Sequence, residues 1–492
     1  MKDLTEGSIA RQLVAMAVPI AAGMLFQTLY FLVDLYFVSA LGDTAIAGVG
    51  FAGNVSFVIL ALTQMLGVGT VALVSHAVGR KDQPEANLIF NQSVLLSGLL
   101  IAATLIAGYA LTGTYVRSVA SDQASAVAGI SYLYWYLPGL ALQFALVAMG
   151  SALRGTGIVQ PTMVVQVVTV LLNTVLAPVL IAGWGTHHPL GVAGAGLAST
   201  LSIAIGVVFL WMYFVRLEHY VALNPAQWRP RLITWKRILN IGLPAGGEFL
   251  MIFLIVAVVY WTIRQFGPAA QAGYGIASRV MQAIFLPAMA LAFAASPVAG
   301  QNFGAGHPER VRQTFRVAAL MSSIIMAALT LLCRWRPELL LHPFTRDPQV
   351  IAVGAPYLRI ISWNFVATGL IFTCSSLFQA LGNTWPSLLS SASRIVTFVL
   401  PAIWLGLGGP FELSHLWYLS VATIALQGLS SLLLLRHQFR TRLARGARAA
   451  VSQARTARTA TESSGNPTTA PDGPPWRRAP GNTSARFRRG RR

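Results

Sequence analysis

The two halves of the chain match each other when the sequence is shifted by 225 positions. The match begins at Pro19, which falls on Pro244, and it is still in register at Pro161, which falls on Pro386. Between these positions the repeated residues include several Gly, several Ala and a Tyr-Leu pair within apolar sequence. A repeat of this length in an apolar chain is typical of secondary transporters, whose two related lobes enclose a site. We therefore expect two lobes built on one scaffold.

The composition excludes an ordinary soluble domain. Of the 492 residues, 55% are hydrophobic and 10% are charged, whereas soluble domains carry about 25% charged residues. Charge clusters separate apolar stretches of about 20 residues, the length of helix that crosses a bilayer core of about 30 Å. The predicted fold is an all-α integral membrane protein with twelve transmembrane helices in two pseudo-symmetric six-helix bundles. The expected spans are 12–39, 46–75, 89–112, 126–152, 160–183, 191–215, 236–263, 270–298, 313–334, 350–378, 386–407 and 414–436.

Lys and Arg are distributed unequally between the two sides of this predicted bundle. The loops on the same side of the membrane as the N-terminus contain more Lys and Arg than the loops on the opposite side. Arg80, Lys81 and Arg154 are among them. Because positively charged loops stay in the cytoplasm, both termini are predicted to be cytoplasmic. Six spans per half make the repeats parallel, about an axis along the membrane normal. The expected organisation is an N-lobe (1–218), a cytoplasmic linker (219–235), a C-lobe (236–437) and a disordered basic cytoplasmic tail (438–492).

The formal net charge of +20 does not by itself indicate nucleic-acid binding. Many of the basic residues lie from Arg436 onward, in sequence that is also rich in Ala, Pro, Ser and Gly. Few aromatic residues, among them Trp476 and Phe487, interrupt this basic run, and a nucleic-acid site needs more aromatic or motif support. We expect no nucleic-acid partner, and attraction of the tail to anionic membrane lipids.

The sequence contains no Walker loop, dinucleotide fingerprint, zinc-ligand spacing or nucleophile elbow. The chain is therefore predicted to be no enzyme and to use no cofactor. An ion gradient remains as its source of energy.

Asp34 lies in an apolar run inside the first predicted helix, far from any basic cluster. An ionised carboxylate near the bilayer centre costs about 3 kcal/mol or more, so it must face a polar cavity, take up a proton or hold a cation. The alternative is an acid that is solvated near the outer end of a tilted helix. Gln27 and Tyr30 share its helical face, which favours an inward-facing polar stripe. Met24 on the same face offers a soft contact to an apolar ligand.

Asn173 lies in the fifth predicted helix, again within apolar sequence. Its amide can orient a carboxylate or supply an oxygen to Na⁺. A lone intramembrane Asn also often serves only as an interhelical hydrogen bond, so both roles stay open. Gln166, two turns earlier, lies on a similar face.

The second half contains one acid near the start of a helix core, Glu248. Two roles fit it: a second titrating group, or an ion-pair partner of Arg279 or Arg394. Gln282 and Asn364 add polarity to this half without charge. Together with Glu248 they form a candidate polar site of the second lobe.

Several short motifs together resemble the multidrug and toxic compound extrusion (MATE) family over about residues 8 to 436. They are Ala17-Val18-Pro19, Leu32-Val33-Asp34, Val38-Ser39-Ala40-Leu41-Gly42, Leu153-Arg154-Gly155-Thr156-Gly157, Gly242-Leu243-Pro244, Ala272-Gly273-Tyr274-Gly275 and Ala380-Leu381-Gly382-Asn383-Thr384. The resemblance implies two six-helix bundles around a V-shaped cavity that opens alternately to the two sides. It also implies export of amphipathic, often cationic small molecules against H⁺ or Na⁺, by a monomer in a bacterial inner membrane.

The family's first-helix aspartate corresponds to Asp34, and its N-lobe cavity positions correspond to Gln27, Tyr30, Tyr132 and Asn173. The resemblance thus predicts a coupling site for H⁺ or Na⁺ and a substrate cavity beside it. The coupling residues are Asp34 and Asn173, and the cavity residues are Met24, Gln27, Tyr30, Tyr132 and Gln166.

This chain departs from the family pattern at two places. The family often has an acid one turn after the asparagine, where this chain has Ala177. In the second half Glu248 comes too soon after Pro244, and the tenth span has Asn364 but no acid. A tight Na⁺ site is therefore disfavoured. We prefer H⁺ coupling through Asp34, with Na⁺ as the alternative and no other metal site.

The predicted mechanism is antiport by alternating access. Protonation or ion binding at Asp34 from outside favours a rearranged first helix and release of substrate. Pro19, with Gly23, is the expected bending point of that helix. Deprotonation towards the cytoplasm restores an anionic pocket for a cationic substrate.

Two other functions compete with drug export. A lipid-linked precursor flippase of the same superfamily needs several cationic residues to hold a diphosphate, and only Arg279, Arg359 and Arg394 are available. A membrane-embedded enzyme or sensor lacks paired catalytic carboxylates and any metal motif.

Overall fold

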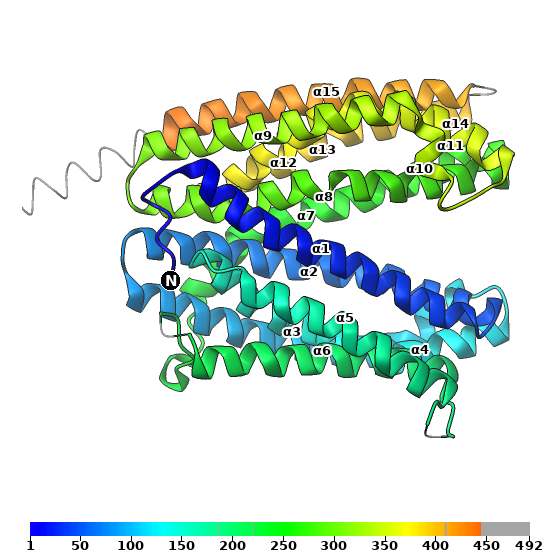
Figure 1. The fold of residues 1–492 in the computed structure, drawn as a ribbon, viewed down its shortest axis with the longest axis horizontal. Helices are drawn as coiled ribbons and strands as arrows, with labels where there is room; N and C mark the ends of the chain where they lie inside the picture. The colour runs from blue at the N-terminus through cyan, green and yellow to red at the C-terminus, as the bar shows by residue number, and fades with distance from the viewer. Residues whose placement is uncertain (186, 219, 409–410, 444–492) are drawn as a thin grey trace, which may run out of the picture. The chain divides into compact units, whose positions relative to one another are not determined.

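The computed structural model describes residues 1–185, 187–218, 220–408 and 411–443 (Figure 1). In these residues every regular element is helical, and twelve helical segments are long and apolar enough to cross a membrane, as predicted. The first half contains α1 (Ile9–Ser39), α2 (Asp43–Gly79), α3 (Gln83–Val119), α4 (Gln123–Gly155), α5 (Gln160–Ala182) and α6 (Gly191–Arg216). The second half contains α7 (Leu232–Ile263), α8 (Pro268–Gly304), α9 (Pro308–Trp335), α10 (Pro337–Leu341), α11 (Pro348–Ile361), α12 (Phe365–Ala380), α13 (Trp385–Arg394), α14 (Leu400–Leu407) and α15 (Leu413–Gln438).

Several helices extend beyond their predicted apolar spans, and α3 is an example. Hydropathy predicted a span at 89–112, whereas α3 has 37 residues and begins at Gln83. Its first turn contains Pro84 and is capped by Asp82, whose Oδ1 accepts from the backbone N–H of Glu85 at 3.0 Å. At 1.5 Å per residue, α3 is about 55 Å long and exceeds a bilayer core of about 30 Å. Hydropathy marks the apolar part of such a helix and misses its polar ends.

Two membrane spans of the second half are interrupted. The tenth span consists of α11 and α12, which are joined by a 3₁₀ turn at Ser362–Asn364. The eleventh consists of α13 and α14, which are joined by a π-helical turn at Ile395–Val399. Such π turns locally change the direction of the side chains that follow. The corresponding helices of the first half, α4 and α5, are continuous, so the two lobes differ in detail.

The two halves meet at the end of the bundle that holds the N-terminus, which we call the terminal end. There a Cβ atom on Gly79 would overlap the backbone oxygen of Gln301, and a Cβ atom on Gly304 would overlap that of His76. Gly304 and Gln301 lie 225 positions after Gly79 and His76. The same close approach is therefore made twice, once in each direction, as a pseudo-two-fold axis requires. The predicted pair of pseudo-symmetric halves is confirmed.

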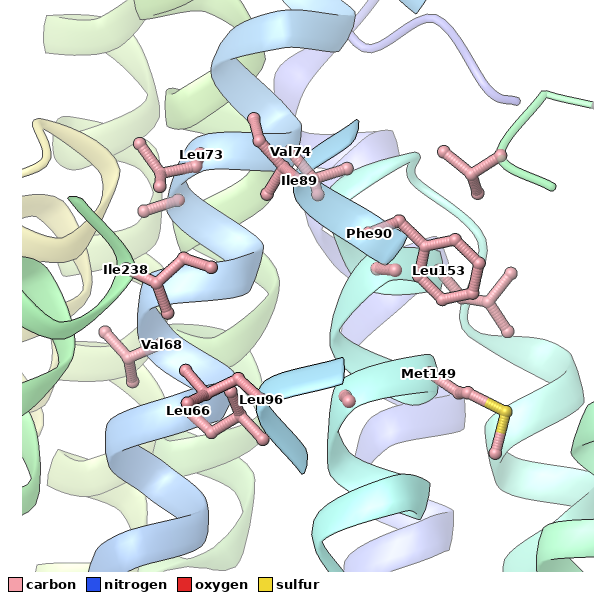
Figure 2. Close-up of a cluster of buried hydrophobic side chains, with 14 of the residues drawn as sticks. Leu66, Val68, Leu73, Val74, Ile89, Phe90, Leu96, Met149, Leu153 and Ile238 are labelled. Carbon is pink, nitrogen blue, oxygen red and sulfur yellow. The ribbon is translucent and has the colours of Figure 1, made fainter. Parts of the chain in front are cut away.

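Buried apolar clusters show where the halves share a core. At the terminal end one cluster contains Leu13 of α1 together with Leu291 of α8. A second shared cluster contains Ile238 of α7 against α2, α3 and α4 (Figure 2). Towards the opposite end each half has a core of its own, around Tyr132 in the first half and Tyr357 in the second. The lobes thus share a hydrophobic core at the terminal end, and each lobe has a separate hydrophobic core towards the opposite end.

The connection between the halves is shorter than the predicted linker at 219–235, because α7 begins at Leu232. The polar face of α3 holds this connection in place. Asn91 Oδ1 accepts from the backbone N–H of Asn224 at 2.8 Å, and Gln92 Nε2 donates to the carbonyl of Gln227 at 2.6 Å.

The last helix extends into the predicted tail. A π-helical turn at Phe439–Leu443 follows α15, and the Leu443 side chain is buried. Arg442 Nη1 donates to the carbonyl of Leu381 at 3.0 Å, which fixes this turn against the second lobe. The predicted start of the tail at 438 is therefore too early. Residues 444–492, for which we predicted disorder, lie outside the described residues.

Candidate functional site

Asp34 lies within the first lobe, where only 7% of its surface is exposed. Tyr132 of α4 donates its hydroxyl to Asp34 Oδ2 at 3.1 Å. Ser199 of α6 donates its hydroxyl to Oδ1 at a long 3.5 Å. The carboxylate thus faces two other helices and is not solvated at a helix end.

Asn173 of α5 extends this network and is fully buried. Its Nδ2 donates to Ser199 Oγ at 3.3 Å and to Tyr30 Oη at 3.4 Å. Its Oδ1 is also buried and has no hydrogen-bond partner within the described part of the chain. The amide therefore forms interhelical hydrogen bonds and still presents one carbonyl oxygen that can accept from water or bind a cation.

Ser199 is the member of this network that the sequence analysis missed. It follows a run of small residues at the start of α6. One of them, Gly196, lies so close to α4 that a Cβ atom there would be 2.6 Å from the backbone oxygen of Tyr132. This close approach brings the Ser199 hydroxyl within reach of Asp34. The small-residue run is typical of a tight helix interface and was the available signal.

The network contains a carboxylate without a counter-charge. The ion pairs in the described residues involve Glu85, Glu309 and Glu338, and none involves Asp34. The described residues also contain no group of three or more His, Cys, Asp or Glu side chains that could hold a metal ion. An ionised carboxylate in such surroundings is stable only if hydrogen bonds, a proton or a bound cation compensate for the lost hydration. The geometry suits a proton or a single monovalent cation.

The predicted cavity residues divide into two groups. Tyr30 and Tyr132 lie in the Asp34 network, as described above. Gln27 is exposed, and Met24 and Gln166 are half-buried. Seven residues of helix separate Gln27 from Asp34, which is about 10 Å along the axis. A shared helical face therefore does not bring the two side chains into contact.

In the second lobe Glu248 of α7 is surrounded by hydroxyl groups. Ser387 of α13 and Ser375 of α12 donate to its Oε2 at 2.7 and 3.0 Å, and Ser391 donates to its Oε1 at 3.3 Å. Ser387 and Ser391 are four residues apart and so lie on one face of α13. The sequence analysis missed these serines because α13 reaches α7 only through the tertiary fold.

The Glu248 carboxylate borders a cavity of about 50 Å³. Most of its lining is apolar or aromatic, and its aromatic side chains are Phe249 of α7, Phe293 of α8 and Phe372 of α12. A single acid in a mainly apolar cavity that contains phenylalanine rings suits an aromatic group that carries positive charge.

The other predicted residues of the second lobe are not part of this site. Neither Arg279 nor Arg394 forms an ion pair with Glu248 in the part of the chain that the structure describes. Gln282 is exposed on α8. Asn364 is buried at the 3₁₀ turn, and its Nδ2 has no hydrogen-bond partner among the described residues. The hydrogen-bond partners of Glu248 are thus serines, and the expected ion pair with Arg279 or Arg394 is not formed.

Comparison with known families explains the repeat. A sequence model of the MatE family matches the chain twice, over residues 19–179 and 244–404, which together exceed half of its length. The chain belongs to the MATE family. The two matches are offset by the same 225 positions as the internal repeat, so each half corresponds to one copy of the MATE unit.

Relatives with known names support this assignment. The chain is 25% identical to the FAD transporter of Shewanella oneidensis over 411 residues, which is 82% of this chain and 90% of that one. It is 26% identical to the multidrug export protein MepA of Staphylococcus haemolyticus over 432 residues, which is 85% of this chain and 91% of that one.

Solved structures agree with the fold. The outward-facing conformation of a multidrug resistance MATE family transporter matches with a TM-score of 0.83 at 25% identity, over 90% of this chain and 98% of that one. Proteins of this family are multi-pass membrane transporters of small molecules and need no cofactor. The chain is therefore a transporter and not an enzyme.

Proposed function

We propose that this MATE protein exports amphipathic, mainly cationic organic compounds in exchange for H⁺, with Asp34 as the coupling group. The supporting observation is a buried carboxylate that accepts hydrogen bonds from Tyr132 and Ser199 and has no ion-pair partner among the described residues. Gain or loss of a proton changes the charge of such a group completely. It therefore also changes the hydrogen bonds that hold three helices together.

The contacts of α1 supply a route from this charge change to the lobes. Protonation of Asp34 removes the charge that the hydroxyls of Tyr132 and Ser199 stabilise, so both hydrogen bonds weaken. Pro19 lies inside α1, and with Gly23 it is the expected bending point of this helix. The beginning of α1 packs against α8 in the cluster shared by both lobes. A change in α1 at Asp34 is thereby transmitted to the interface between the lobes.

The arrangement of the cores supports an outward-open state. We place the terminal end in the cytoplasm, because loop charge favours cytoplasmic termini. The lobes share apolar clusters at that end and have separate cores towards the other. In this orientation the cytoplasmic side is closed, which is the state from which an exporter releases its substrate.

Na⁺ coupling is the alternative. Asp34 and the unpartnered Oδ1 of Asn173 are oxygen ligands of the kind that Na⁺ accepts. Ala177, one turn after Asn173, is fully buried and supplies no second carboxylate. A site with one acid and few oxygens favours a proton over a tightly bound Na⁺.

The cavity at Glu248 favours drug export over flipping of a lipid-linked diphosphate. A flippase needs its cationic residues gathered at one site. Here Arg359 pairs with Glu338 at 3.4 Å, and Arg279 is exposed. We therefore retain export of aromatic cations, by a monomer that contacts lipids in a bacterial inner membrane.

Transport in proteoliposomes tests this proposal. Purified protein is reconstituted, and uptake of the aromatic cation rhodamine 123 is driven by an imposed pH gradient or, separately, by a Na⁺ gradient. We expect uptake with the pH gradient in wild type and in Asp43→Asn, a matched control at an exposed acid, and background uptake in Asp34→Asn. Full gradient-driven uptake by Asp34→Asn would reject the role of Asp34. Uptake driven by Na⁺ alone would reject the preference for H⁺.

A further inference from the structure

Arg154 is a cation at the lobe interface that the proposed mechanism does not use. The charge pattern placed it with the cytoplasmic segments, but its side chain lies inside the protein at the end of α4. Its Nε is shielded from solvent and has no hydrogen-bond partner in the described residues, and its Nη2 donates to Ser151 Oγ at 2.9 Å. Its guanidinium carbon lies 5.9 Å from the ring centroid of Phe293, in the other lobe. The side chain therefore reaches across the lobe interface without meeting an acid.

Arg154 borders a small cavity on the pseudo-two-fold axis. Among the lining residues are three pairs whose members lie 225 positions apart: Val68 and Phe293, Val71 and Ser296, and Arg154 and Gln379. When both members of several such pairs face one cavity, the cavity lies on the axis that relates the lobes. Its volume is about 10 Å³, close to the space that one water molecule needs.

Two shielded polar atoms of the residues that line this cavity, Arg154 Nε and Ser296 Oγ, have no hydrogen-bond partner in the described residues. Ser296 is only 3% exposed, yet its hydroxyl has no hydrogen-bond partner in the described part of the chain. None of the described acidic residues forms an ion pair with Arg154. A shielded guanidinium without an anion is costly, and its planar set of donors matches the oxygens of a carboxylate or phosphate. The unused donors of Arg154 and Ser296 thus point to an anionic ligand.

We propose that Arg154, with Ser296 and Gln379, binds the anionic group of an aromatic substrate, a carboxylate or a phosphate, when the terminal end is open. This inference rests on the proposed export function and extends its substrates from cations to aromatic anions and zwitterions. Closure of the terminal end reduces the site to about one water volume, as seen here, and so expels the group.

The neighbouring cavity supports a substrate with two charges. Phe293 and Gln379 line both the Arg154 cavity and the Glu248 cavity. An aromatic body against Phe293 therefore borders one cavity that contains a cationic side chain and another that contains an acidic side chain. The two cavities together suit a zwitterion whose charges flank an aromatic ring.

Two dyes with the same aromatic body test this site. Rhodamine 110 has a free carboxylate, and rhodamine 123 is its methyl ester. Binding of each dye to purified protein is measured by fluorescence polarisation, and transport is measured in proteoliposomes. The variants are Arg154→Gln, which installs the residue found at the repeat-related position, Arg154→Lys, which keeps the charge, and Arg216→Gln, which removes an exposed charge elsewhere.

For Arg154→Gln we expect at least about tenfold weaker binding of rhodamine 110, because a contact between opposite charges is lost. The dissociation constant of rhodamine 123 should change by less than about twofold. Arg154→Lys should retain part of the preference for rhodamine 110, and Arg216→Gln should behave as wild type. In wild type, benzoate and phenyl phosphate should displace rhodamine 110 and so show which anion is preferred.

Equal weakening of both dyes by Arg154→Gln would show a structural role for Arg154 and overturn the anion site. Unchanged binding of rhodamine 110 would overturn it as well. In both cases transport of rhodamine 123 by wild type leaves the proposed export function standing. If wild type transports neither dye under any gradient, the export function fails, and the anion site that rests on it fails too.

Discussion

The first lobe surrounds Asp34 with hydroxyl and amide groups, whereas the second lobe fills the repeat-related positions mainly with apolar side chains. In the first lobe these positions are Tyr30, Asp34, Tyr132 and Asn173, and 225 residues later they are Ile255, Val259, Tyr357 and Phe398. All four residues of the second set belong to one buried apolar cluster. Tyr357, the one residue type shared with the first set, packs its ring against Tyr274 and Trp417.

The two lobes share the residues of their packing interface but not the residues of their candidate sites. The glycines at the lobe interface, Gly79 and Gly304, occur in both halves because backbones touch there and leave no room for a side chain. The acids of the two candidate sites occur in one half each: Asp34 corresponds to Val259, and Glu248 corresponds to Gly23. The repeat therefore provides a symmetric frame, on which the first lobe holds the candidate coupling site and the second a candidate substrate contact.

Moving the carboxylate between the lobes should have the largest effect on stability. In Val259→Asp an acid enters the apolar cluster of Ile255 and Phe398, where the positions equivalent to Asn173 and Ser199 are Phe398 and Ile424. We expect the free energy of unfolding to fall by about 3–5 kcal/mol. Asp34→Val removes a buried carboxylate instead, so the free energy of unfolding should stay within about 1 kcal/mol of wild type or rise, while transport is lost. Denaturant unfolding in detergent measures both, and equal stabilities of the two variants would contradict the comparison.

The arrangement of membrane spans could be predicted from the sequence more completely than the residues of the candidate site. The twelve spans follow from apolar stretches, since a bilayer demands about 20 apolar residues per helix. Asp34 could be found because an acid in such a stretch is rare. Ser199 could not, because a Ser in a small-residue helix has no special meaning until the packing of α6 against α4 is known. The same holds for Arg154, since loop charge shows the side of the membrane but not whether a side chain enters the lobe interface.

Substitution of the interface glycines should have an intermediate effect on the free energy of unfolding. Gly79→Ala and Gly304→Ala each place a methyl group against the backbone of the other half. Each should lower the free energy of unfolding by about 1–3 kcal/mol, and the two values should agree within about 1 kcal/mol, because the frame is symmetric. Hydrogen exchange near residues 76–79 and 301–304 should increase in both variants. Gly50→Ala is the control, since a Cβ atom there meets nothing within 4 Å; a large effect at only one of the two interface positions would contradict the symmetry.

The tyrosine pair gives the smallest but most specific effect. Tyr132 and Tyr357 are both buried and repeat-related, but Tyr132 donates to a carboxylate and Tyr357 lies in an aromatic cluster. A hydrogen bond to an ionised group contributes about 1.5–3 kcal/mol. Tyr132→Phe removes that bond and so makes the ionised state of Asp34 less favourable. We therefore expect the pH for half-maximal proton-driven transport to rise by about one unit or more.

Tyr357→Phe is the matched control for that shift, because it removes the same hydroxyl at the equivalent position of the other lobe. Its pH profile should coincide with that of wild type, and both variants should unfold at similar denaturant concentrations. The measurement is initial transport rate against pH in proteoliposomes at a fixed pH gradient. If both variants shift the profile alike, the second lobe also takes part in proton coupling. If neither shifts it, the hydrogen bond between Tyr132 and Asp34 does not set the protonation of the coupling site, and the functional difference between the lobes must then lie in the remaining partners of Asp34.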